Sequence, residues 1–174
     1  LIVLVNSVYK NLENKNERDI LNGKMPINYF INKSFENMKH LIDYDFIEIG
    51  TSNFDTLIEQ ANDSTIGLSI DAVKYYIDKL PNKPNVKKIN VGISDKEGII
   101  PVYYIPEDVI EKNKLKSWFK GTNKIGDFHP LHEKHNVKHL VKIDNIKVIP
   151  ISKLFFENKV RNVKYLKIDT EGHD

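Results

Sequence analysis

The sequence predicts one α/β domain built on a doubly wound, mostly parallel sheet with helices on both faces. Two observations lead to this prediction. Short apolar runs alternate with amphipathic stretches along the chain, and the turns between them are short. Strands that alternate with helices favour right-handed crossovers and therefore parallel pairing. At 174 residues, 40% of them hydrophobic, the chain suffices for one domain with a sizeable core.

The first part of the chain is expected to precede the sheet. We predict that residues 1–42 form a helical or extended segment that packs on the core, and that residues 43–174 form the sheet domain. Apolar residues recur at three-and-four spacing from Ile27 to Ile42, which predicts a helix. The opening Leu1–Val5 run is far shorter than the roughly twenty apolar residues that cross a bilayer, so no membrane association is predicted.

Strands and helices then alternate up to a turn near residue 95. A glycine closes the first strand, and small polar residues after it are suited to cap a helix. A proline stops the second helix. In order, the expected elements are a strand at Phe46–Ile49, a helix through Leu57 with cap residues at Thr51–Asn53, a strand at Ile66–Ile70, a helix at Val73–Leu80 and a strand at Val86–Ile93.

The alternation breaks after this third strand. Ile99–Ile105 is expected to return beside it, and Pro101 favours an edge position because proline lacks an N–H group. Residues 106–136 are polar and irregular, which predicts a long inserted loop, either functional or solvated. The expected remainder is extended structure at Val137–Pro150, a short helix at Ile151–Asn158 and a strand at Val163–Ile168.

Polar side chains follow four of the predicted strands. Ligands of open α/β sheets bind outside the carboxyl ends of the strands. Asp71 lies about twenty residues after Gly50, the spacing at which an acid accepts hydrogen bonds from ribose hydroxyls. Together these strand ends predict a nucleoside pocket. Its candidate residues are Glu48, Gly50, Thr51 and Ser52 after the first strand, Asp71 after the second, Ser94 and Asp95 after the third, and Asp169 and Glu171 after the last.

The type of nucleoside follows from what surrounds Gly50. A dinucleotide site would need G-x-G-x-x-G, and Ser52 and Phe54 occupy the later glycine positions. Glu48 is also poorly placed beside a diphosphate, whereas it suits the positive sulfonium and ammonium groups of S-adenosylmethionine. We therefore predict this cofactor, and a nicotinamide-dependent reductase is the weaker alternative.

Composition limits the partners and the compartment. The net charge is +2 and the basic residues are scattered, so no nucleic-acid partner is predicted. The chain has no cysteine, which excludes disulfides and thiolate catalysis and favours a cytoplasmic location.

Several stretches make the sequence resemble the FkbM family of S-adenosylmethionine-dependent methyltransferases. The terminal K-I-D-T-E-G stretch at Lys167–Gly172 is the most specific of them. The others are F-I-E-I-G at Phe46–Gly50, G-L-S-I-D at Gly67–Asp71 and N-V-G-I-S-D-K-E-G at Asn90–Gly98. The resemblance implies a class I, Rossmann-like enzyme that methylates a hydroxyl group on a sugar, a glycan or a small metabolite.

The resemblance also implies roles for the candidate residues. Glu48, Gly50 and Ser52 would lie along the methionine part of the cofactor, Thr51 would belong to the same cofactor site, and Asp71 would hold the ribose. Ser94 and Asp95 would lie near the adenine. Asp169 would lie close to the sulfonium methyl, and Asp169, Glu171 or a histidine would act as the general base.

The sequence departs from the family pattern in two places. The first motif, usually D-x-G-A-N-x-G, lacks its second glycine because Phe54 stands there. This favours an alternative function, a non-catalytic nucleoside-binding or interaction domain. The family also continues beyond the K-I-D-x-E-G stretch, so we expect a fold that is incomplete at its C-terminus, with an uncovered edge beside Val163–Ile168.

Four histidines lie close together at positions 129, 132, 135 and 139. Pro130 interrupts the helix that would align them, and no aspartate or cysteine completes a familiar metal-binding pattern. We therefore predict no metal site. The segment is interpreted as a solvated polar loop, with a substrate-facing lid that includes Trp118 and Lys120 as the alternative.

Overall fold

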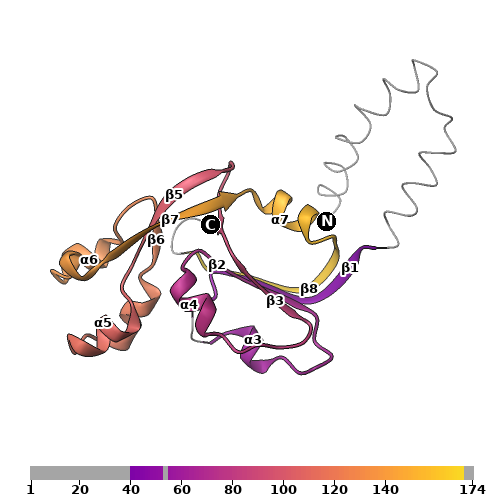
Figure 1. Cartoon of the computed structure of the whole chain (residues 1–174), viewed down its shortest axis with the longest axis horizontal. Helices are drawn as coiled ribbons and strands as arrows, with labels where there is room; N and C mark the ends of the chain where they lie inside the picture. The colour runs from indigo at the N-terminus through magenta and orange to yellow at the C-terminus, as the bar shows by residue number, and fades with distance from the viewer. Residues whose placement is uncertain (1–39, 53–54, 171–174) are drawn as a thin grey trace, which may run out of the picture. The chain divides into compact units, whose positions relative to one another are not determined.

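The structure is a computed structural model that describes residues 40–52 and 55–170 (Figure 1). The chain divides into two compact units, Leu1–Asp43 with Ser152–Asn162 and Tyr44–Ile151 with Val163–Asp174. Most of the helix predicted from Ile27 lies outside the described residues, and Ile42, its predicted end, begins a strand instead. Within the described residues, no helix is long and apolar enough to cross a membrane.

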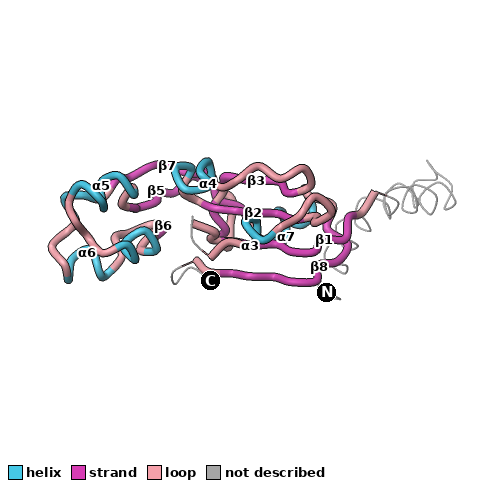
Figure 2. Tube along the Cα trace, turned by 90° about the horizontal axis from the view of Figure 1, so that it is seen from below, coloured by secondary structure: helices cyan, strands magenta, loops and turns pink. Residues whose placement is uncertain are grey.

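Sheet A contains the parallel strands that the sequence predicts. Its spatial order is β3-β2-β1-β8, which Figure 2 shows as neighbouring strands. β1 pairs with β2, and β2 with β3, in parallel. All of β2 is buried, including its polar residues Ser69 and Asp71, as expected for a central strand of a parallel sheet. The strands are β1 (Ile42–Ile49), β2 (Gly67–Asp71), β3 (Val86–Asn90) and β8 (Val160–Ile168).

β8 forms an edge of sheet A. Its large apolar side chains are exposed, with 56% of Tyr165, 42% of Leu166 and 44% of Ile168 accessible. The edge expected to be uncovered beside Val163–Ile168 is therefore uncovered among the described residues.

Two short helices follow β1 and β2: α3 (Leu57–Gln60) and α4 (Lys74–Lys79). The helix start predicted from cap residues at Thr51–Asn53 is wrong, because α3 begins only after Thr56. The Glu48 carboxylate accepts the N–H of Leu57 at 3.0 Å and so satisfies a donor at this helix end. The two helices and strands β1 and β3 share a buried cluster of Phe46, Ile58, Ala61, Ile77, Leu80 and Val86.

A second sheet, sheet B, was not predicted. The expected single strand at Val86–Ile93 changes sheet at Val91, because β4 (Gly92–Ile93) pairs in parallel with β7 (Lys142–Ile149). β5 (Gly98–Tyr104) pairs antiparallel with β7 and with the short β6 (Lys124–Ile125), not with β3. The sheet order is β4-β7-β5-β6. The prediction of one mostly parallel sheet therefore holds for sheet A, while sheet B is mixed.

Pro101 lies inside sheet B and not at its edge. It is opposite Asn145 of β7, and its carbonyl accepts the N–H of Gly126 at 2.7 Å. β6 is so short that it pairs only with Val102 and Tyr103. The missing N–H of Pro101 is therefore tolerated at the end of the β5–β6 ladder.

Residues 106–136 are folded, which corrects the prediction of an irregular loop. They contain, besides β6, α5 (Glu107–Lys112), the 3-10 helix η1 (Ser117–Gly121) and α6 (Pro130–Lys134). Their apolar side chains form a small core of Ile105, Ile110, Phe119 and Val137. Trp118 stacks on Phe119 with the ring centroids 4.0 Å apart.

One short helical element precedes β7 along the sequence and another follows it. They are η2 (Lys138–Leu140) and α7 (Ile151–Glu157). The helix predicted at Ile151–Asn158 is therefore confirmed.

Candidate functional site

The carboxyl ends of β1, β2 and β8 meet at one edge of sheet A. The N–H groups of Gly50 and Thr51 both donate to the Ile70 carbonyl, at 2.8 and 3.3 Å. The N–H of Asp169 donates to the Ile49 carbonyl at 2.9 Å. These bonds continue the pairing of the strands into the turns, so the residues after three strands are held side by side.

Gly50 is required by the geometry of this edge. Its φ is +79°, in the left-handed region that L-residues rarely adopt. A Cβ atom on Gly50 would also lie 1.8 Å from the Asp169 carbonyl oxygen. Only glycine therefore lets the β1 turn approach the end of β8 this closely.

The turn after Gly50 is fixed by hydrogen bonds to other elements. Ser52 has a φ of +47°, and its N–H donates to Asp71 Oδ2 at 2.7 Å. Its hydroxyl donates to the Lys120 carbonyl at 3.3 Å. Residues 50–52 are thus bound both to β2 and to the segment before β6.

Asp71 is the most constrained acid of the site. It is 5% exposed, and its Oδ1 accepts the N–H of Val73 at 2.6 Å, while Oδ2 accepts the N–H of Ser52. Burial raises the pKa of Asp71 to about 6, although the N–H groups of Ser52 and Val73 act to lower it. Each carboxylate oxygen can accept a further hydrogen bond, so Asp71 retains the capacity to bind a hydroxyl group.

A pocket of about 160 Å³ opens at this edge. Gly50, Thr51, Ser52, Asp71 and Asp169 line it, so the structure brings together five of the predicted site residues. The pocket is also lined by residues that the sequence did not single out: Asp55, Lys167 and Thr170 near the sheet A edge, and Val91, Ile93, Asn123, Lys124 and Ile125 on its other side.

Glu48 does not line the pocket, although we expected it along the methionine part of the cofactor. Its side chain is fully buried, and both carboxylate oxygens accept protein donors, the Lys167 ammonium and the Leu57 N–H, each at 3.0 Å. Burial raises the pKa of Glu48, and the hydrogen bonds from Lys167 and Leu57 act against this shift.

Ser94 and Asp95 also lie outside the pocket lining. The Ser94 hydroxyl donates to Asp95 Oδ1 at 3.2 Å, and its N–H donates to the Ile149 carbonyl at 3.0 Å. The residues nearby that do line the pocket are Val91 and Ile93, together with Lys124 and Ile125 of β6. Glu171, the second predicted acid of the last strand, lies outside the described residues.

None of the histidines that the structure describes lines the pocket. His132 is fully buried, with Nε2 2.9 Å from the Thr122 hydroxyl. Because that hydroxyl already donates to Phe119, His132 donates from Nε2. Burial lowers the pKa of His132 to about 4, so this histidine is neutral near pH 7. Among the residues that the structure describes, no group of three His, Asp or Glu side chains could hold a metal ion.

The lid proposed around Trp118 and Lys120 is also corrected in part. Neither side chain lines the pocket, but Gly121, Asn123 and Lys124, which follow them, do. The same part of the chain therefore forms a wall of the pocket, through residues that no sequence pattern marked.

The mixed α/β fold and the pocket at the parallel strand ends are compatible with a methyltransferase. Residues 48–174 match the sequence profile described as Methyltransferase FkbM domain. This match covers most of the chain, and the chain therefore belongs to the FkbM methyltransferase family, as the sequence resemblance indicated. No curated protein matches the chain, and no solved structure does.

Proposed function

We propose that this methyltransferase uses S-adenosylmethionine and methylates a hydroxyl group of a sugar, a glycan or a small metabolite. Family membership implies a methyl donor, and the pocket at the ends of β1, β2 and β8 is the proposed place for it. The observation that carries the proposal is the arrangement of Asp71 and Asp169 on either side of the Gly50 turn. Parallel strands of a Rossmann-like sheet present ligand-binding residues at this edge.

The residues present fit a cationic nucleoside. Three carboxylates line the pocket, those of Asp55, Asp71 and Asp169, and one of its two lysines, Lys167, is paired with Glu48. Gly50 lets the turn after β1 lie directly against the Asp169 carbonyl. We assign the ribose hydroxyls to Asp71 and the methionine part to the Gly50–Ser52 turn. Val91, Ile93 and Ile125 would form an apolar surface for the adenine.

Asp169 is the proposed general base. S-adenosylmethionine, when bound, supplies an electrophilic methyl group on a sulfonium. The chain must hold the acceptor oxygen about 3 Å from that carbon and in line with the bond that breaks. Asp169 lies at the end of β8 in the pocket, and its carboxylate would accept the proton of the acceptor hydroxyl.

The proposed acceptor is a small molecule or a glycan, and the proposed location is the cytoplasm. The absence of cysteine from the sequence supports the location.

A methyl-transfer assay with Asp169→Asn tests the assignment of the base. Wild-type protein, S-adenosylmethionine and a panel of hydroxyl-bearing sugars should release S-adenosylhomocysteine. Asp169→Asn should slow turnover by about 100-fold or more, with little change in affinity for S-adenosylhomocysteine. Asp78→Asn is the matched control, because Asp78 is an exposed acid of α4 paired with Lys74. Wild-type turnover by Asp169→Asn would contradict the assignment.

A further inference from the structure

A partly buried ion pair links the ends of β1 and β8 beside the pocket. Lys167 Nζ lies 3.0 Å from Glu48 Oε1, and the side chains of Lys167 and Glu48 are 25% and 0% exposed. Oε2 of Glu48 accepts the N–H of Leu57 at 3.0 Å. The Lys167 ammonium also donates to the Asp55 carbonyl at 2.9 Å. The pair therefore contacts the chain before and at the end of the β1–α3 loop, a name used here for the described residues 50–52 and 55–56 alone.

The β1–α3 loop has an unfavourable backbone conformation at three of its residues. Gly50, Ser52 and Asp55 have φ values of +79°, +47° and +51°. Positive φ is costly for serine and aspartate and persists only where surrounding contacts impose it. For Ser52 the contact is its N–H bond to Asp71, and for Asp55 it is the bond from Lys167 to its carbonyl.

Lys167 also balances the negative charge around the pocket. Burial acts to lower its pKa, but the hydrogen bond to Glu48 and the charges of Glu48, Asp55 and Asp169 raise the pKa overall. Lys167 therefore stays charged near neutral pH. A buried ion pair is weak evidence for net stability, because desolvation offsets most of the attraction. Its placement against the loop indicates a role in shaping the site.

We propose that Lys167 is a positioning residue whose ion pair with Glu48 holds the β1–α3 loop in the conformation that binds the methyl donor. Lys167 lies in β8, two residues before Asp169, and both residues line the pocket. One side chain thereby fixes the loop next to Asp169. The ligand in this inference is the one named in the proposed function, on which the inference rests.

The test uses a double variant that avoids an unpaired buried charge. Lys167→Met alone would leave Glu48 buried without its partner, and such a variant can fail to fold. Glu48→Gln with Lys167→Met removes both charges, and the glutamine oxygen can still accept the Leu57 N–H. Lys164→Met is the matched control, because Lys164 forms an ion pair with Asp45 in the same two strands, at 2.7 Å and with 70% and 35% exposure.

Hydrogen exchange of the unliganded protein and S-adenosylhomocysteine titrations give two independent readouts. The double variant should show faster amide exchange in a peptide covering residues 50–57, and at least tenfold weaker binding. Lys167→Arg keeps the charge and should retain part of the wild-type exchange protection and affinity. Lys164→Met should change neither the exchange rate nor the affinity. Wild-type exchange in the double variant would overturn the inference. If wild-type protein fails to bind S-adenosylhomocysteine, the proposed function fails, and exchange alone decides whether Lys167 positions the loop.

Discussion

Gly50 gives the sharpest prediction at the scale of single residues. In Gly50→Ala the new Cβ would meet the Asp169 carbonyl, and a φ of +79° would be strained. We expect a loss of at least about 1–3 kcal/mol in the free energy of unfolding, and weaker binding of S-adenosylhomocysteine. Gly98→Ala is the control, since its Cβ would meet nothing within 4 Å. Thermal unfolding and calorimetry of both variants check this, and equal behaviour would contradict it.

Asp71 makes the stability depend on pH. Its pKa of about 6 in the folded chain lies above the ordinary value of 3.8, because burial disfavours the ionised form. Its stabilising contribution is therefore complete below the ordinary pKa and is lost as the pH rises through about 6. Between pH 4.5 and 7, wild-type stability should fall by about 2 kcal/mol relative to Asp71→Asn.

Urea unfolding at the two pH values measures this difference. Asp71→Asn carries no charge at position 71, so the comparison isolates the ionisation of this carboxyl. A difference that stays constant, or that grows in favour of the wild type toward pH 7, would show that folding does not raise the pKa of Asp71.

Three of the predicted site residues that line the pocket have one property in common. Gly50 and Asp169 directly follow strands and Asp71 ends one, so a strand pattern alone places them at the sheet edge. Lys167 could have been found in the same way, from its spacing to Asp169. Asn123 could not, because it enters the pocket only through the pairing of β6 with β5.

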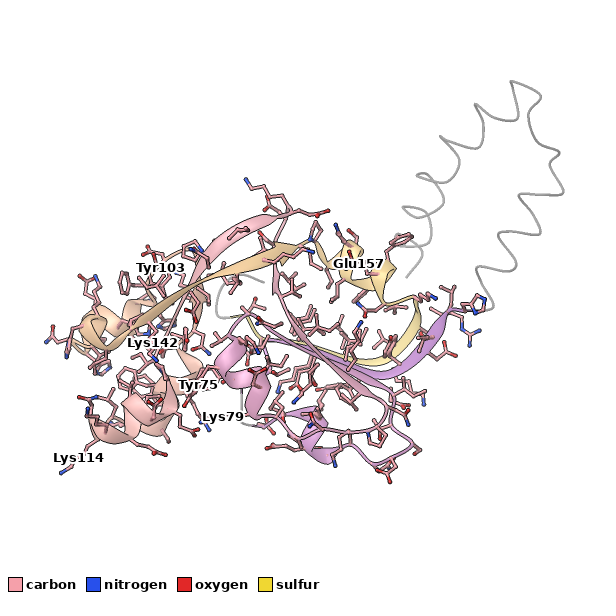
Figure 3. All side chains as sticks on the ribbon, in the orientation of Figure 1. Tyr75, Lys79, Tyr103, Lys114, Lys142 and Glu157 are labelled. Atoms are coloured by element: carbon pink, nitrogen blue, oxygen red, sulfur yellow. The ribbon has the colours of Figure 1, made fainter. Side chains whose placement is uncertain are left out.

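At the scale of elements, α4 holds in place the segment that contributes Gly121, Asn123 and Lys124 to the wall of the pocket. The Tyr76 hydroxyl donates to the Ile105 carbonyl within the core. Tyr75 and Lys79 extend from α4 to Asp108 and Glu107 of α5, at 3.1 and 2.7 Å (Figure 3). The contact thus has one buried hydrogen bond and an exposed polar rim.

Tyr76→Phe should destabilise the fold more than Tyr75→Phe. The first change leaves the buried Ile105 carbonyl without this donor, at a cost of about 1–3 kcal/mol. The second removes an exposed hydrogen bond to Asp108, and its effect should stay within about 0.5 kcal/mol. Urea unfolding of both variants decides the matter, and similar losses would contradict the assigned roles.

The helices of residues 106–136 escaped prediction for a physical reason. α5 and α6 span six and five residues, and each buries only one side chain, Ile110 and His132. Such short helices leave no apolar period in the sequence. Their stability comes from partners distant along the chain, such as Val137 for Ile110.

At the scale of the whole molecule, the sequence predicted the parallel sheet but not the second sheet. Residues 86–93 read as one continuous extended stretch in the sequence, which hides the change of sheet at Val91. The change depends on β4 pairing with β7, a contact between distant segments that local pattern does not encode. The predicted boundary between residues 1–42 and 43–174 stays a prediction.

The central claim is that the pocket at the ends of β1, β2 and β8 binds S-adenosylmethionine. Isothermal titration calorimetry with S-adenosylmethionine and S-adenosylhomocysteine tests it most directly. We predict micromolar dissociation constants for both ligands and no binding by Asp71→Ala, because this change removes the acid assigned to the ribose and the acceptor of the Ser52 N–H. No heat of binding from folded wild-type protein, or unchanged binding by Asp71→Ala, would contradict the claim.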